Sequence, residues 1–144
     1  MKRLIPMLAL VLVVQSCNDD DIVCGGECKY DTIPGTAVIG VIAPDTLDAR
    51  ICENAVFVYF DFAPADTNAP DHYKFPNWPD TDRRIFVGDG KNPPSSWLEA
   101  KGLDVGTVHD CVRLEETKGT CTPVLFRFSK VDYSGWPAYC EPRQ

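Results

Sequence analysis

Seven cysteines give this chain of 144 residues its clearest capacity for covalent chemistry. A cysteine thiolate can take up a lipid, form a disulfide or bind zinc, and its surroundings decide between these fates. Cys17 lies apart from the other six, directly behind an apolar stretch at the start of the chain. We therefore expect its chemistry to differ from theirs.

The residues before Cys17 have the layout of a secretory signal. Met1-Lys2-Arg3 is a short cationic start, and Leu4 to Val14 is an apolar run. That run is too short for a permanent membrane span, which needs about 20 apolar residues. Its end, Val14-Gln15-Ser16-Cys17, resembles the lipobox of bacterial lipoproteins. The resemblance implies that residues 1–16 are a signal peptide, removed directly before Cys17, and that the Cys17 thiol carries palmitate or a similar acyl chain as a membrane anchor.

An acidic run, Asn18-Asp19-Asp20-Asp21, follows Cys17. Its composition is typical of a solvated tether, and we assign residues 17–29 to an acidic, lipid-anchored segment. The run also resembles the surface-export signal of Bacteroidota lipoproteins. That resemblance implies the bacterial outer membrane, with the cell-surface face favoured over the periplasmic one.

The remaining six cysteines form an even set in a chain predicted to be exported, which favours up to three disulfides. We expect Cys24 and Cys28 to fix the amino-terminal segment, and Cys52 to reach Cys111 or Cys121 across the core. Zinc, the alternative for the first two, would need further ligands at a recognised spacing, so we predict no metal site. The candidates are Cys24, Cys28, Cys52, Cys111, Cys121 and Cys140.

A proline-rich segment from Ala63 to Arg83 is the best candidate for ligand binding. At about twenty residues it is long for so small a domain, and such loops are commonly functional. Its rings at Tyr73, Phe75 and Trp78 suit a sugar or a groove in a partner protein. The alternative is that the segment folds back and its aromatic side chains cover an open sheet.

Carboxylates and amides cluster at Asp66-Thr67-Asn68, Asp80-Thr81-Asp82 and Asp89-Gly90-Lys91-Asn92. Calcium prefers such oxygen ligands on loops, but none of the three has the glycine and closing glutamate of an EF-hand. Asx residues also make turns without a metal, which is the commoner case. We therefore predict no cofactor, with calcium as the alternative.

Catalytic motifs are missing from the sequence: it has no Gly-x-Ser-x-Gly and no His-Glu-x-x-His. We predict that the protein is not an enzyme. Nucleic-acid binding is also disfavoured, because 21 acidic side chains outnumber 14 basic ones. Removal of residues 1–16 leaves twelve basic side chains against the same 21, so the net charge becomes −9.

Apolar runs rich in β-branched and aromatic residues, bounded by Pro or Gly, predict five short strands. We expect them at 36–43, 55–62 and 84–87, with a hairpin around Lys118-Gly119. One short helix is expected within 94–103, ending at its glycine. The inward-facing residues of the hairpin are predicted to be Val108, Val112 and Leu114 on the first strand, and Val124, Phe126 and Phe128 on the second.

These elements predict an all-β domain over residues 30–144, an antiparallel, disulfide-stabilised β-sandwich with one short helix. Val38-Ile39-Gly40-Val41 and Asn54-Ala55-Val56-Phe57-Val58 resemble the opening hairpin of carboxypeptidase-regulatory-like and transthyretin-like modules. That likeness covers a small part of the chain and implies an immunoglobulin-like or transthyretin-like sandwich, without implying an activity. Closure of the edge strands into a small barrel is the alternative.

The sequence thus predicts a lipid-anchored outer-membrane or surface lipoprotein. Its β-sandwich would be a non-catalytic binding module for an envelope protein or glycan, for instance as an accessory subunit of an envelope complex. The alternative is an inhibitor or immunity protein that occludes a basic toxin or hydrolase, because a net charge of −9 would steer a basic target toward it. A purely structural envelope component is the third reading.

Overall fold

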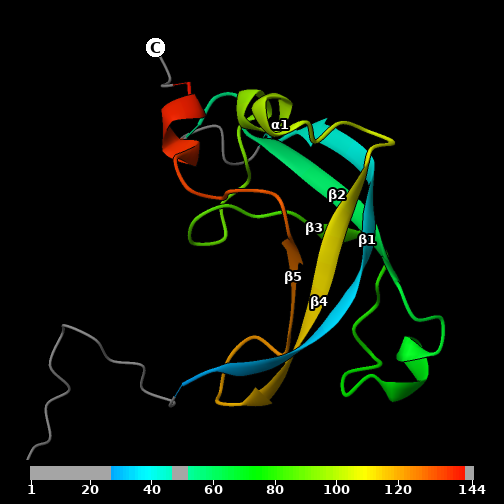
Figure 1. Ribbon diagram of the computed structural model, residues 1–144. Helices are drawn as coiled ribbons and strands as arrows, with labels where there is room; N and C mark the ends of the chain where they lie inside the picture. The colour runs from blue at the N-terminus through cyan, green and yellow to red at the C-terminus, as the bar shows by residue number, and fades with distance from the viewer. Residues whose placement is uncertain (1–26, 47–51, 142–144) are drawn as a thin grey trace, which may run out of the picture.

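The computed structural model describes residues 27–46 and 52–141. The predicted antiparallel β-structure with one short helix is confirmed, and the strands form one sheet in the order β3-β2-β1-β4-β5 (Figure 1). Among the described residues, no helix has the length and apolar character needed to cross a membrane. The elements are β1 (Lys29–Pro44), β2 (Val56–Pro64), η1 (Ala69–His72), β3 (Arg83–Arg84), α1 (Ser95–Lys101), β4 (Val108–Lys118), β5 (Val124–Phe128) and η2 (Trp136–Tyr139).

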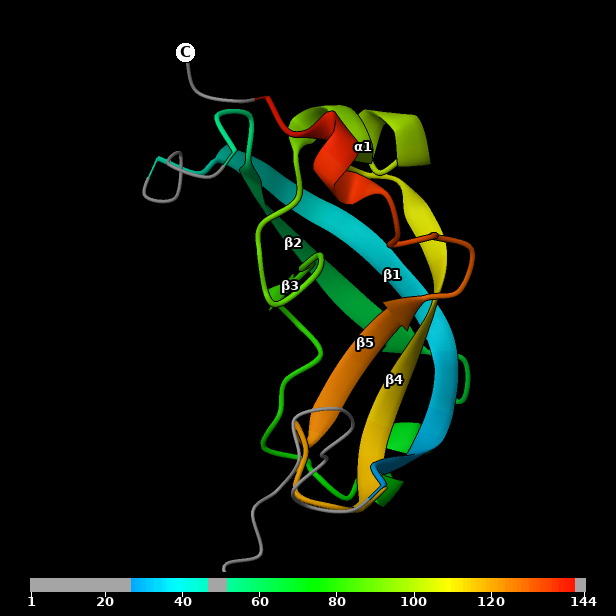
Figure 2. The ribbon, with the colours of Figure 1, turned by 90° about the vertical axis from the view of Figure 1, so that its left-hand side faces the viewer.

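The long strand β1 gives the sheet its shape. Residues 29–38 pair with β4, whereas residues 35–44 pair with β2, so the two partners overlap over only a short stretch. A bulge at Gly40 interrupts the register with β2, and a bulge increases local twist and bend. The sheet therefore curls into a half-barrel, with β3 and β5 as its two edges (Figures 1 and 2).

The core fills the concave side of this curled sheet. The ring of Phe60 on β2 meets those of Phe126 and Phe128 on β5 edge-to-face, with centroids 5.6 and 5.1 Å apart. Such pairs across the concavity hold the two halves of the sheet together. The largest fully buried apolar side chains are those of Trp97, Phe60, Phe128, Ile39, Leu103, Val58 and Val87.

One end of the half-barrel is covered by α1 and η2, which lie side by side in both views (Figures 1 and 2). The helix ends as predicted, because Gly102 adopts the left-handed conformation with φ 67° and its amide donates to helix carbonyls. Pro94 rather than a serine occupies the N-cap. The Ser96 hydroxyl instead donates to the Tyr139 carbonyl at 2.9 Å, which ties α1 to η2.

The predicted inner face of β4 is wrong. Val108 is 61% exposed, and Val112 and Leu114 are only half-buried. The strand instead buries the alternate set, whose polar members are Arg113 and Glu115. A shift of one residue exchanges the faces of a strand, and here the charged face turns inward because the loop before β3 supplies partners for it. On β5 the prediction is confirmed, since Val124 and Phe128 are buried and Phe126 is half-buried.

Two disulfides join distant parts of the described chain, and their pairing corrects our expectation for Cys52. Cys52 bonds to Cys140, not to Cys111 or Cys121, because the carboxy-terminal segment returns to the start of β2. Cys28 bonds to Cys121, which fixes the beginning of β1 to the β4–β5 hairpin. The predicted tether, residues 17–29, therefore overlaps the folded domain at its end, because Cys28 forms a disulfide and Lys29 belongs to β1.

Cys111, a predicted disulfide candidate, is a free thiol on the inner face of β4. It is 1% exposed, and burial raises the pKa of its thiol to about 12. A buried, protonated cysteine of this kind behaves as a small apolar side chain. The remaining predictions for cysteines, lipidation of Cys17 and a disulfide of Cys24, lie outside the described residues.

Candidate functional site

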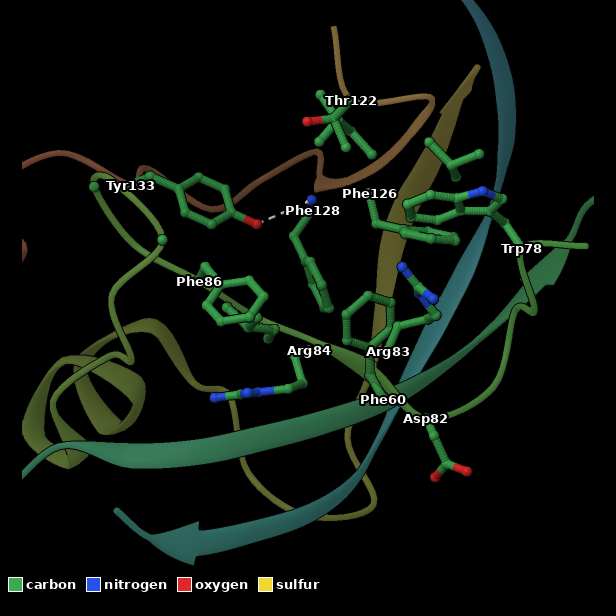
Figure 3. A pocket seen from close by; sticks show the side chains of 15 residues that line it. Phe60, Trp78, Asp82, Arg83, Arg84, Phe86, Thr122, Phe126, Phe128 and Tyr133 are labelled. Carbon is green, nitrogen blue, oxygen red and sulfur yellow. Dashed lines mark hydrogen bonds between the residues drawn. The ribbon is translucent and has the colours of Figure 1, made fainter. Parts of the chain in front are cut away.

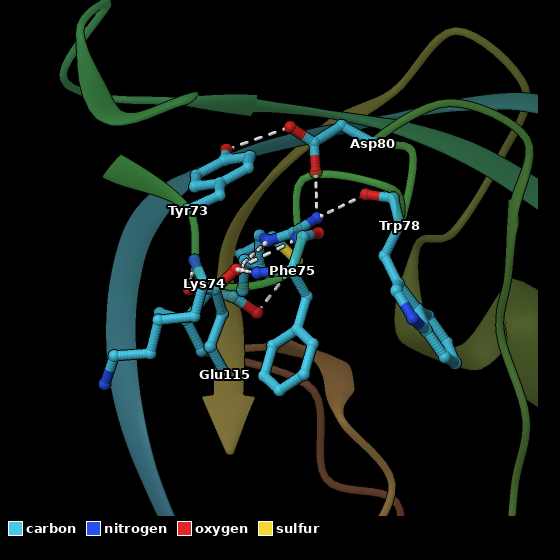
Figure 4. Close-up of polar contacts among 9 residues, drawn as sticks. Tyr73, Lys74, Phe75, Trp78, Asp80 and Glu115 are labelled. Atoms are coloured by element: carbon cyan, nitrogen blue, oxygen red, sulfur yellow. Dashed lines mark hydrogen bonds and ion pairs between the residues drawn. The ribbon is translucent and has the colours of Figure 1, made fainter. Parts of the chain in front are cut away.

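A buried guanidinium joins the sheet to the proline-rich loop. Arg113 on β4 is 0% exposed, and its Nη1 donates to Asp80 Oδ1 at 2.6 Å and to the Trp78 carbonyl at 2.9 Å (Figure 4). Its Nη2 donates to Glu115 Oε1 at 3.0 Å and to the Phe75 carbonyl at 2.8 Å. The loop therefore folds over the inner side of the sheet, held by charge-assisted hydrogen bonds.

Tyr73 completes this network. Its ring lies over Arg113, with the guanidinium carbon 4.0 Å from the ring centroid, and its hydroxyl donates to Asp80 Oδ2 at 2.9 Å. Burial and the Asp80 carboxylate raise the pKa of the Tyr73 phenol well above its ordinary value. Glu115 is occupied as well, because its Oε2 accepts the Lys74 amide at 3.0 Å. The oxygens of both carboxylates therefore already have donors.

The three aromatic residues predicted to bind a ligand are thus not equivalent. Tyr73 stacks on the buried arginine, and the Phe75 backbone takes part in the same network. These contacts match the alternative in which the loop folds back onto the sheet. Trp78 differs, because its ring borders an open cavity.

The cavity, which we call the β3–β5 cleft, occupies about 670 Å³ between the edge at β3 and the edge at β5 (Figure 3). A sheet that closed fully would have no such gap, so the cleft follows directly from the incomplete curl. Its size falls within the range of small-molecule sites, about 300–1,000 Å³. The walls are rich in rings and aliphatic groups, contributed by Phe60, Trp78, Ile85, Phe126, Phe128 and Tyr133.

Arg83 on β3 brings a positive charge into this apolar wall. Its guanidinium carbon lies 5.5 Å from the centroid of Trp78 and 5.3 Å from that of Phe126 (Figure 3). Among the residues that the structure describes, Arg83 has no carboxylate partner, and its buried Nε has no acceptor. Burial and the nearby Arg113 charge lower the pKa of Arg83 from its ordinary high value. The cleft thus contains a guanidinium whose buried Nε–H has no acceptor among the described residues.

The neighbouring Arg84 is differently placed although it also borders the cleft. Its side chain points away from Arg83 and stacks on Phe57 and Phe86, with centroids at 4.6 and 4.7 Å (Figure 3). Its Nη2 donates to Asn92 Oδ1 at 2.6 Å. Adjacent residues on a strand face opposite sides, so Arg83 and Arg84 lie at different parts of the cleft wall, and Arg83 is the one among the rings of Trp78 and Phe126.

No protein-family model, curated protein or solved structure matches this chain. Its function must therefore rest on the chemistry of its own residues. Of the predicted ligand-binding residues, the structure brings Trp78 together with Arg83 at the cleft. Sequence reasoning did not single out Arg83, Arg113 or Glu115, because charged residues in strands are ordinarily assigned to the solvent side.

Two of the carboxylates considered for calcium, those of Asp66 and Asp80, have protein partners in the described part of the chain. Asp66 Oδ1 accepts the Asn68 amide at 2.9 Å, which is the Asx turn given as the commoner case. Asp80 is taken up by Tyr73 and Arg113. Within residues 27–46 and 52–141, no three side chains of the metal-binding types come together.

Proposed function

We propose that this protein is a non-catalytic binding module, anchored at the bacterial outer membrane by lipid on Cys17, and that the β3–β5 cleft holds its ligand. The anchor is supported by the lipobox-like sequence, and the outward face by the acidic run behind it. The ligand would be an envelope glycan or a segment of an envelope protein. An immunoglobulin-like or transthyretin-like sandwich stays a prediction, since the five described strands form one curled sheet.

One observation carries the binding proposal: an aromatic-walled cleft that contains Arg83 without an internal acceptor. Arg83 is half-buried, and leaving its buried Nε–H without an acceptor is unfavourable, so such groups favour sites completed by a ligand. Rings supply contact area at small cost in conformational entropy, and a charged group adds orientation and selectivity. The cleft therefore favours binding over a purely structural role.

The cleft also weighs against occlusion of a basic toxin or hydrolase at this site. A basic partner would meet the positive guanidinium of Arg83, and like charges in an apolar site repel one another strongly. The inhibitor hypothesis is based on the net negative charge of the chain alone, whereas the binding hypothesis is based on the β3–β5 cleft.

A panel of neutral, basic and acidic envelope oligosaccharides tests the proposal, with the full lipidated chain in detergent micelles. At least one component should bind, and Trp78→Ala should weaken that binding at least about tenfold, as loss of an aromatic contact predicts. Tyr59→Ala is the matched control, because Tyr59 alternates with the inward-facing Phe60 on β2. Failure of the whole panel to bind would exclude an envelope glycan as the ligand, and equal effects of the two substitutions would refute the cleft as the ligand site.

A further inference from the structure

We infer that the β3–β5 cleft recognises an acidic sugar residue, with the carboxylate of the sugar on Arg83 and the sugar ring against the aromatic wall. This inference rests on the proposed binding function and adds the chemical class of the ligand. Its starting point is the pair of arginines Arg83 and Arg113, of which, among the residues that the structure describes, Arg113 alone has carboxylate partners.

Asp80 and Glu115, the two carboxylates paired with Arg113, cannot serve Arg83 without leaving Arg113. Asp80 Oδ1 accepts from Arg113 and Asp80 Oδ2 accepts from Tyr73. Glu115 Oε1 accepts from Arg113 at 3.0 Å, and its Oε2 from the Lys74 amide. Because Arg113 is fully buried, moving either acid would leave its positive charge without one of its carboxylate partners in the core. An acceptor for the Arg83 Nε–H is therefore supplied by water or by a ligand that enters the cleft.

The surroundings of Arg83 favour a carboxylate as that acceptor. Trp78 and Phe126 both lie within cation–π distance of the guanidinium, so it is held among rings while its Nε–H has no acceptor among the described residues. A guanidinium presents a planar fork that matches the two oxygens of a carboxylate. A partly desolvated setting strengthens such a charge-assisted pair.

The remainder of the cleft favours a compact ring over an inserted peptide strand. A peptide that closed the half-barrel would pair with both edges, but β3 is only two residues long. On the other edge, the Phe128 amide already donates to the Tyr133 hydroxyl at 3.3 Å. A volume of about 670 Å³ and several ring faces suit one or a few sugar units.

Three matched trisaccharides test this ligand class by calorimetry with the full lipidated chain in detergent micelles. They are galacturonic acid trisaccharide, its methyl ester and galactotriose, which share the ring and differ in the charged group. The acid should bind about 10- to 100-fold more tightly than either neutral form, as one charge-assisted contact predicts. Equal binding of acid and ester, or no binding of the acid, overturns the inference. Tighter binding of an oligo-aspartate peptide would overturn it in favour of an acidic protein segment.

Two arginine variants locate the contact. Arg83→Gln should remove the preference for the acid, whereas Arg127→Gln, which loses the same charge at an exposed position of β5 outside the cleft lining, should keep it within about twofold. Thermal unfolding without ligand shows whether each variant folds, and the comparison of acid with ester on the unaltered protein needs no variant. If galactotriose binds as tightly as the acid and its binding depends on Trp78, the inference of an acidic sugar is refuted but the proposed binding function is supported. If neither Arg83→Gln nor Trp78→Ala weakens binding of the acid, both the acidic-sugar inference and the proposed binding in the cleft are refuted.

Discussion

At the scale of single residues, Arg113 shows how a fully buried charge is tolerated in this fold. Two carboxylates and two loop carbonyls accept from its guanidinium, and Tyr73 covers its face. Removing one partner from such a group leaves an uncompensated charge, which is worse than having no charged group at all. The network therefore fixes the loop that carries Trp78 to the cleft.

Glu115→Gln should lower the free energy of unfolding by about 3 kcal/mol, because it removes one of the two acids that neutralise buried Arg113. Urea denaturation measures the change. Asp110→Asn is the matched control, since it breaks the exposed ion pair with Lys130 at 2.6 Å, which should leave stability unchanged within error. A loss of stability no larger for Glu115→Gln than for the control would contradict the role given to the network.

Tyr73 predicts a loss of stability at alkaline pH. Burial and Asp80 raise the pKa of its phenol in the folded protein, while in the unfolded chain it titrates near pH ~10. The raised pKa means that its contribution is complete below about pH 10 and declines as the pH rises toward the folded value. Urea unfolding at pH steps above about 9 should show this decline, and Tyr73→Phe should flatten it. An identical pH profile for the variant would contradict the buried phenol.

At the scale of elements, β1 organises the sheet because it serves two partners along its length. Its amino-terminal part belongs to the β4 side and its carboxy-terminal part to the β2 side, with Gly35 in the overlap. A Cβ at Gly35 would collide with the Ala63 carbonyl oxygen and the Phe62 ring. The close approach of the two strands there requires glycine.

Gly35→Ala should therefore destabilise the protein by about 1–3 kcal/mol, the range for forced overpacking. Thermal or urea unfolding measures it. Gly40→Ala is the control within the same strand, because its Cβ would meet only the Tyr59 carbonyl oxygen at an ordinary 3.8 Å. If the two variants unfold alike, the strands do not approach at Gly35 as described.

The strands and the short helix could be predicted because their signals are local. Runs of β-branched and aromatic residues predicted residues 36–43 of β1 and most of β2, and the glycine after α1 ends the helix with a positive φ. The prediction missed the start of β1 at Lys29, and of the strand expected at 84–87 only Arg84 lies in β3. The inner face of β4 could not be predicted. Hydrophobic alternation assigns Val112 and Leu114 to the inner face, and it contains no information about charged side chains that pair with each other in the core, as Arg113 and Glu115 do. The position of Arg83 in a cleft could not be predicted either, because the cleft forms only when the curl of the sheet brings β3 toward β5.

At the scale of the whole molecule, the chain carries a net negative charge, whereas its β3–β5 cleft contains the positive guanidinium of Arg83. The chain enters the fold beside that cleft, because Cys28 is bonded to Cys121 and the next residue, Thr122, lines the wall. The eleven residue-to-residue steps from Cys17 to Cys28 reach at most about 40 Å when fully extended. A lipid on Cys17 would thus hold Cys28, at the entrance of the chain to the fold, within that distance of the membrane surface.

The anchor itself is tested by metabolic palmitate labelling. Cys17→Ala should abolish the label and release the protein from membranes, since stable attachment needs the acyl chains. Cys111→Ala is the control, because the buried thiol of Cys111 is unsuited to acylation and the label should persist. Continued labelling of Cys17→Ala would contradict the proposed anchor.

Indole resonances offer the most direct test of the β3–β5 cleft. The chain has three tryptophans, of which Trp78 borders the cleft and Trp97 is 0% exposed. On titration of the full chain with whichever oligosaccharide of the panel binds, the Trp78 indole N–H signal should shift most, while the Trp97 signal stays in place. A saturating ligand that leaves the Trp78 signal unmoved would contradict the account.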